Sequence, residues 1–155
     1  MIPERSTGNE KIDGGTNIML KLMIGVKGTG KTKALIAMVN EAAETTHGNV
    51  VCIEKGIKLK YDVKYEARLI NTNDYLIFDA QTLYGFIAGI LASDHDVTDV
   101  FVDATLKICN HDLRAFEKLA LQLDELTEKA NVNVVMTVSM PVEDASDVVK
   151  KYVME

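Results

Sequence analysis

Met19-Leu-Lys-Leu-Met-Ile-Gly25-Val-Lys-Gly-Thr-Gly-Lys31-Thr32 is the stretch of sequence that decides the fold of this chain. Its first six residues form a short apolar run, which predicts a buried strand. The glycines that follow predict a tight turn, because glycine adopts backbone angles that other residues avoid. Apolar residues then recur at helical spacing until His47-Gly48, so the sequence predicts a strand, a turn and a helix in direct succession.

The turn has the pattern of a phosphate-binding loop. Gly25 and Gly30 are separated by four residues and are followed by a lysine and a hydroxyl residue, which is the Walker A pattern. Backbone N–H groups and the start of the helix would surround a β-phosphate. Lys31 would reach the β and γ oxygens, and the Thr32 hydroxyl would bind Mg²⁺. The predicted nucleotide-binding residues are Gly25, Val26, Lys27, Gly28, Thr29, Gly30, Lys31, Thr32 and Lys33.

Through this loop the chain resembles the P-loop NTPase superfamily over most of Met19 to Tyr152, and it also resembles small bacterial P-loop ATPases. The resemblance implies an α/β fold, a three-layer α/β/α sandwich with a mostly parallel sheet. The rest of the sequence agrees, since candidate strands alternate with helical patterns. Strands are predicted at 50–53, 75–78, 100–102 and 132–138, with an alternating edge strand or hairpin at 57–69. Helices are predicted after residue 31, at 83–93, at 113–130 and from Asp144.

The superfamily resemblance also implies a Walker B aspartate at the end of another strand, where it holds the magnesium. Asp103 follows Val-Phe-Val, and Asp79 follows Tyr-Leu-Ile-Phe. We favour Asp103, because a strand and a helix must precede the Walker B strand, and a long helix and a further strand follow Asp103. Asp79 then suits the N-cap of the next helix, because aspartate accepts hydrogen bonds from free backbone N–H groups.

Glu54 is the candidate for activating water. The predicted strand at 50–53 makes the chain resemble the branch of the superfamily with an inserted strand, and its RecA-like members place a glutamate at the tip of the strand after the Walker A helix. Ala104 follows Asp103, so the Asp-Glu pair of other members is missing. The alternative for Glu54 is an exposed charge at a strand end. Thr137 and Ser139 are candidates for a γ-phosphate sensor, with plain strand hydroxyls as the alternative.

The nucleotide is predicted to be ATP, bound with Mg²⁺. The guanine-specific patterns of the superfamily are missing, since Asp103 leads into Ala-Thr-Leu. Small-molecule kinases of the superfamily close an arginine-bearing lid, whereas Arg68 and Arg114 are the only arginines beyond the first 18 residues. An ATPase with Lys31 and Glu54 as catalytic residues and Thr32 and Asp103 as metal ligands is therefore favoured over a kinase. A nucleotide-dependent switch or adaptor is the second hypothesis.

Chain length, net charge and cysteine content limit the remaining possibilities for domains, partners and location. A chain of 155 residues predicts one domain, here 19–155, after a flexible leader or expression remnant at 1–18. A net charge of -6 disfavours a protein that coats nucleic acid, so affinity for nucleic acid is predicted to be weak at most.

A basic stripe is predicted along the 57–69 strand. It could bind a protein partner or form a solvated edge, and it consists of Lys58, Lys60, Lys64 and Arg68. Cys52 and Cys109 are predicted to be reduced packing residues. We expect a cytoplasmic protein with no membrane span, acting through nucleotide and a partner or second copy.

Overall fold

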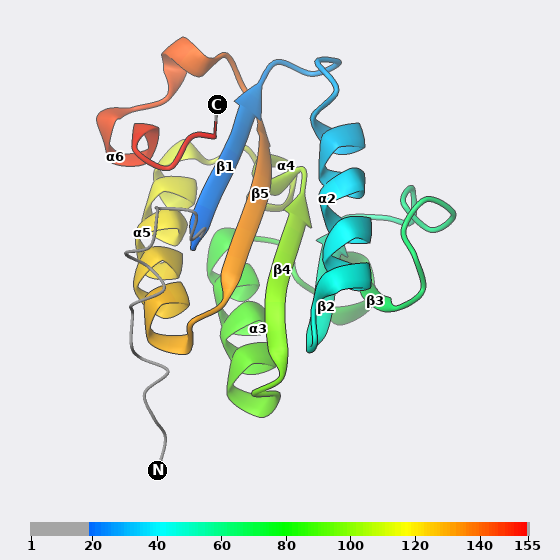
Figure 1. The fold of residues 1–155 in the computed structure, drawn as a ribbon. Helices are drawn as coiled ribbons and strands as arrows, with labels where there is room; N and C mark the ends of the chain where they lie inside the picture. The colour runs from blue at the N-terminus through cyan, green and yellow to red at the C-terminus, as the bar shows by residue number, and fades with distance from the viewer. Residues whose placement is uncertain (1–18, 155) are drawn as a thin grey trace.

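Five parallel strands form the centre of the molecule in the computed structural model, which describes residues 19–154 (Figure 1). The predicted leader at 1–18 lies outside the described residues. The strands are β1 (Leu20–Gly25), β2 (Asn49–Glu54), β3 (Ala67–Asn71), β4 (Val97–Asp103) and β5 (Asn133–Ser139). The helices are α2 (Lys31–Thr45), α3 (Ala80–Ser93), α4 (Thr105–Ile108), α5 (Leu113–Ala130) and α6 (Asp147–Lys150), with 3₁₀ turns at Thr72–Tyr75 and Val142–Asp144.

The strands lie in the order β1-β5-β4-β2-β3, and every neighbouring pair is parallel. All five carboxyl ends therefore meet at one edge of the sheet, where ligands bind in open α/β folds. Gly25 is paired in register with Ser139, and Glu54 is paired with Asp103. The strand that leads into the glycine-rich loop and the strand that ends in Asp103 are separated by β5.

Helices cover both faces of the sheet (Figure 1). In β2, Val50 and Cys52 pack with α2 on one face, whereas Val51 and Ile53 pack in the core under α3 and α5 on the other. Burial on both faces explains why β2 and β5 are near-continuous apolar runs. The predicted three-layer α/β/α sandwich is confirmed, and Cys52 and Cys109 are buried free thiols as expected.

The strand predicted at 57–69 is wrong except at its end, where β3 begins at Ala67. Residues 56–66 instead turn back on themselves, since Asp62 N–H and Val63 N–H both donate to the Leu59 carbonyl at 3.0 and 3.1 Å. Leu59 is buried, whereas Tyr61 and Tyr65 are 89% and 90% exposed. These alternate residues therefore do not share one face, as they would in a strand. The local turn determines which of them are buried.

The strand predicted at 75–78 is also wrong. A 3₁₀ turn at Thr72–Tyr75 begins where the Asn71 side chain accepts from Asn73 N–H, and it ends at Leu76 in the left-handed region. The closing helix predicted from Asp144 begins later, at Asp147, because Val142–Asp144 forms a separate 3₁₀ turn. Beyond it, Tyr152 and Met154 form backbone hydrogen bonds with Leu22, which extends the edge of the sheet beside β1. The short helix α4 was not predicted.

Candidate nucleotide-binding site

The loop between β1 and α2 has the backbone shape that its glycines predict. Gly28 and Gly30 both have φ near 88°, a region in which side chains other than glycine are strained. A Cβ atom on Gly25 would lie 3.0 Å from the Thr29 hydroxyl, so a larger residue would crowd the turn. These three glycines therefore give the loop its path from the sheet edge into the first turn of α2.

Lys31 folds back over its own loop. Its Nζ donates to the Val26 carbonyl at 3.0 Å, and the Thr29 hydroxyl donates to the same oxygen at 2.8 Å. Partial burial lowers the pKa of Lys31, while the nearby Asp103 carboxylate opposes that change. The Val26 carbonyl holds the ammonium group at the mouth of the loop, where a phosphate oxygen could replace it as the acceptor.

Asp103 connects the loop to the centre of the sheet. The Thr32 hydroxyl donates to the two carboxylate oxygens of Asp103 at 3.1 and 3.3 Å. From β5, the Thr137 hydroxyl donates to Asp103 Oδ1 at 2.9 Å and accepts from Ala104 N–H at 2.7 Å. Thr137 thus fixes the orientation of the Asp103 carboxylate, and its role as a γ-phosphate sensor stays a prediction.

Asp79, the alternative to Asp103, lies in a different part of the fold. Its carboxylate accepts from Thr82 N–H at 2.8 Å and completes a capping box at the start of α3. These hydrogen bonds lower the pKa of Asp79. The predicted N-cap is present, and within residues 19–154 no side-chain hydrogen bond joins Asp79 to the glycine-rich loop.

Glu54 lies beside Asp103 but is covered. The residue is 3% exposed, and its Oε2 accepts from Leu59 N–H at 3.0 Å. Desolvation raises the pKa of Glu54, and the Leu59 N–H, the Lys58 N–H and the Lys58 charge act in the opposite direction. The alternative of an exposed charge at a strand end is wrong. In this structure the carboxyl group anchors the 56–66 segment against the end of β2.

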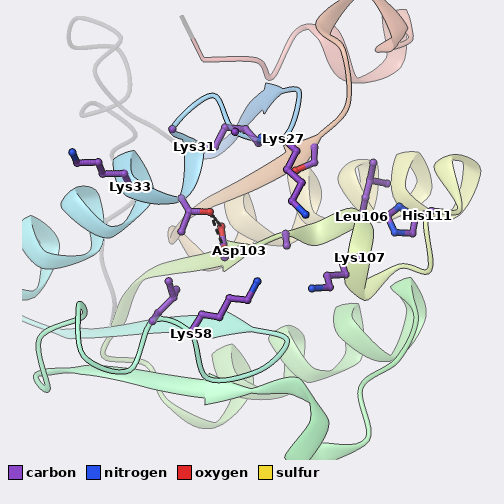
Figure 2. Close-up of a pocket in the computed structure, with 14 residues that line it drawn as sticks. Lys27, Lys31, Lys33, Lys58, Asp103, Leu106, Lys107 and His111 are labelled. Carbon is purple, nitrogen blue, oxygen red and sulfur yellow. Dashed lines mark hydrogen bonds between the residues drawn. The ribbon is translucent and has the colours of Figure 1, made fainter.

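A cavity of about 400 Å³ opens in front of Asp103 (Figure 2). The glycine-rich loop and the start of α2 form one wall, and the 56–66 segment and α4 form the opposite wall. Ser139 also lines the cavity. Its lining includes Lys58, Lys107 and His111, none of which the sequence analysis assigned to the nucleotide. Lys107 lies in α4, which begins just after the strand that ends in Asp103, and His111 follows α4. This closeness to Asp103 in the sequence was the available signal.

The donor set suits a magnesium ion that takes most of its ligands from water and phosphate. Within residues 19–154 there is no cluster of three or more histidine, cysteine or acidic residues that could enclose a metal. Mg²⁺ in phosphate-transfer sites is held by one or two carboxylates together with substrate oxygens, so the single Asp103–Thr32 pair fits such a site.

In the part of the chain that is described, no helix combines the length and apolar character needed to cross a bilayer.

No protein-family model matches the sequence, and no curated protein matches it. Among solved structures, the chain is similar to PCH-2 of C. elegans, with a TM-score of 0.53 and 15% sequence identity. The similarity covers 92% of this chain and 35% of PCH-2, so the chain spans about a third of that protein's length. Identity at this level indicates a shared fold alone. Together with the five-stranded parallel sheet and its flanking helices, it shows that the chain has an α/β fold.

Proposed function

We propose that the protein binds Mg-ATP at the glycine-rich loop and hydrolyses it to ADP and phosphate. The observation that carries the proposal is the hydrogen bond between Thr32, directly after the loop lysine, and Asp103, at the tip of β4. The two residues are 71 positions apart in sequence, yet they form the hydroxyl–carboxylate pair expected around a nucleotide-bound Mg²⁺.

In the proposed complex, each group has a separate task. Backbone N–H groups of residues 25–32 hold the β-phosphate, and Lys31 leaves the Val26 carbonyl to contact the β and γ oxygens. Thr32 would be a ligand of Mg²⁺, and Asp103 would hold the ion directly or through water. The bound Mg²⁺ would neutralise charge that develops on the phosphate oxygens during hydrolysis.

The strand predicted at 50–53 is not the inserted strand, because β2 lies on the other side of β4 from β1. Assignment to the branch with an inserted strand is supported instead by β5, which separates the loop strand from the Asp103 strand. The pairing of Glu54 with Asp103 supports the RecA-like role of Glu54 as the group that orients water. In this role Glu54 must release Leu59 N–H, since its carboxylate is covered in the structure. Hydrolysis therefore requires movement of the 56–66 segment.

The burial of Glu54 favours a second function, a nucleotide-dependent switch. A site whose water-orienting group is buried turns over slowly until a partner or second copy moves the covering segment. ATP binding is common to both functions, whereas stimulated hydrolysis is specific to the ATPase. A cytoplasmic location remains part of the proposal.

Calorimetric titration with Mg-ATP, together with measurement of phosphate release, tests the proposal. Wild type is expected to bind Mg-ATP, Lys31→Ala to lose binding, and Asp103→Asn to lose the part of the affinity that depends on Mg²⁺. Asp79→Asn is the matched control, because it removes a carboxylate from a strand-to-helix connection outside the cavity. Loss of binding in Asp79→Asn with normal binding in Asp103→Asn would overturn the site.

A further inference from the structure

The cavity wall opposite the phosphate loop carries positive charge from two other segments. Lys58 follows β2, and Lys107 lies in α4. Figure 2 shows Lys58, Lys107 and the loop residue Lys27 extending toward the same space in front of Asp103, whereas Lys33 points away from it. Three segments that are far apart in sequence thus direct lysine side chains into one cavity.

None of these three lysines forms an ion pair among the described residues, although the charge of Lys58 also acts on the buried Glu54 carboxyl group. Within residues 19–154, the single ion pair joins Lys64 to Glu44, outside the cavity. The cavity lining includes one carboxylate, that of Asp103. This concentration of positive charge occurs in a chain with a net charge of -6, and it favours an anionic ligand.

The geometry of the loop indicates which part of the ligand reaches this wall. In the proposed complex the loop backbone would hold the β-phosphate, and Thr32 and Asp103 would hold the magnesium ion. The third phosphate would then lie in the space between the two walls, in front of Asp103. It adds at least one negative charge where Lys58 and Lys107 provide positive charge.

Building on the proposed function, we propose that Lys58 and Lys107, together with Lys27, bind the γ-phosphate and make the site select triphosphate over diphosphate. The positive charge at the γ-phosphate then comes from lysines of the same chain. Arg68 and Arg114 do not line the cavity, so within the described residues no arginine of this chain takes that role.

Calorimetry with the full chain tests the selection directly. Dissociation constants are measured for Mg-ADP and for a hydrolysis-resistant Mg-ATP analogue, at one fixed ionic strength, in wild type and in Lys58→Gln/Lys107→Gln. Lys60→Gln is the matched control, since Lys60 lies in the same exposed segment but does not line the cavity. The double substitution is expected to weaken the triphosphate roughly tenfold, allowing for solvent screening of exposed lysines, and the diphosphate by less than about threefold.

The outcomes separate the two proposals. Wild type that binds triphosphate no better than diphosphate overturns the γ-phosphate assignment while nucleotide binding stands. Equal weakening of both ligands in the double variant, or no weakening of either, also overturns it. Wild type that binds neither nucleotide overturns the proposed function and this inference together. Selective loss of triphosphate affinity, with Lys60→Gln unchanged, supports the assignment.

Discussion

At the scale of single residues, the neighbouring carboxyl groups Glu54 and Asp103 have different environments. Asp103 faces the cavity and accepts from the hydroxyls of Thr32 and Thr137. Glu54 is buried and accepts from a backbone N–H. Asp103 is therefore accessible from the cavity, whereas the 56–66 segment covers Glu54.

Glu54→Gln is expected to retain ATP binding and to lose hydrolysis. Glutamine keeps an oxygen that can accept from Leu59 N–H, but it cannot act as a base toward water. Single-turnover hydrolysis should fall by about 10²-fold or more, while the ATP dissociation constant changes by less than about tenfold. Rapid-quench measurement of phosphate release determines the first value and calorimetry the second. Unchanged hydrolysis would leave Glu54 with only its anchoring role.

The burial of Glu54 also predicts that the free energy of unfolding depends on pH. Glu54 has an ordinary pKa of 4.5, which desolvation raises in the folded protein. Folding therefore favours the protonated form, and ionisation destabilises the fold as pH rises through 4.5 toward the higher folded value. Glu54→Gln should be more stable than wild type at pH 7, and this advantage should shrink as pH falls below 4.5. Urea denaturation at both pH values measures the difference, and a constant difference would contradict the prediction.

At the scale of elements, a capping box stabilises the first turn of α3. Asp79 and Thr82 exchange hydrogen bonds between side chain and backbone at the first turn. Asp79→Ala removes that capping box, so the free energy of unfolding is expected to fall by ~1 kcal/mol. Denaturant titration measures this loss, and Mg-ATP affinity should remain unchanged. An affinity loss in Asp79→Ala would show that Asp79 contributes to the nucleotide site.

The basic stripe predicted at 58–68 is not one face of a strand. Lys58 lines the cavity, while Lys64 pairs with Glu44 at 3.0 Å and Arg68 lies in β3. Few cations therefore remain for nucleic acid, and any binding should be weak, with a salt slope of at most about 3 or 4. Fluorescence anisotropy with single-stranded DNA, comparing wild type with Lys60→Glu/Lys64→Glu, tests this prediction. A steeper slope, or strong binding at physiological salt, would contradict it.

At the scale of the whole molecule, a nucleotide bound as proposed would contact both the glycine-rich loop before α2 and Asp103 at the end of β4. A ligand at a hundredfold its dissociation constant stabilises the folded state by ~2.7 kcal/mol. For a domain of this size, Mg-ATP should raise Tm by roughly 5–10 °C. Differential scanning fluorimetry measures the shift, and Lys31→Ala is expected to show none. An equal shift in Lys31→Ala would remove Lys31 from the site.

The sequence alone determined the glycine-rich loop, the α/β class and most of the helices and strands. Residues 25–32 are contiguous, and their glycine spacing encodes the loop shape locally. The apolar runs of β2, β4 and β5 predict buried strands for the same local reason. The prediction was wrong at 57–66, where alternation of Ile57, Leu59 and Tyr61 suggested a strand. The backbone there turns around the Leu59 carbonyl instead.

Only the tertiary structure decided which distant residues reach the loop. Parallel pairing brings Thr32, Asp103 and Thr137 together, although each is separated from the others by more than thirty positions. The tertiary structure also determines that Glu54 is covered and that Lys58 and Lys107 face the loop across the cavity. Local periodicity encodes whether a residue lies in a strand or helix, but strand order and the packing of connecting segments determine which side chains meet at the sheet edge.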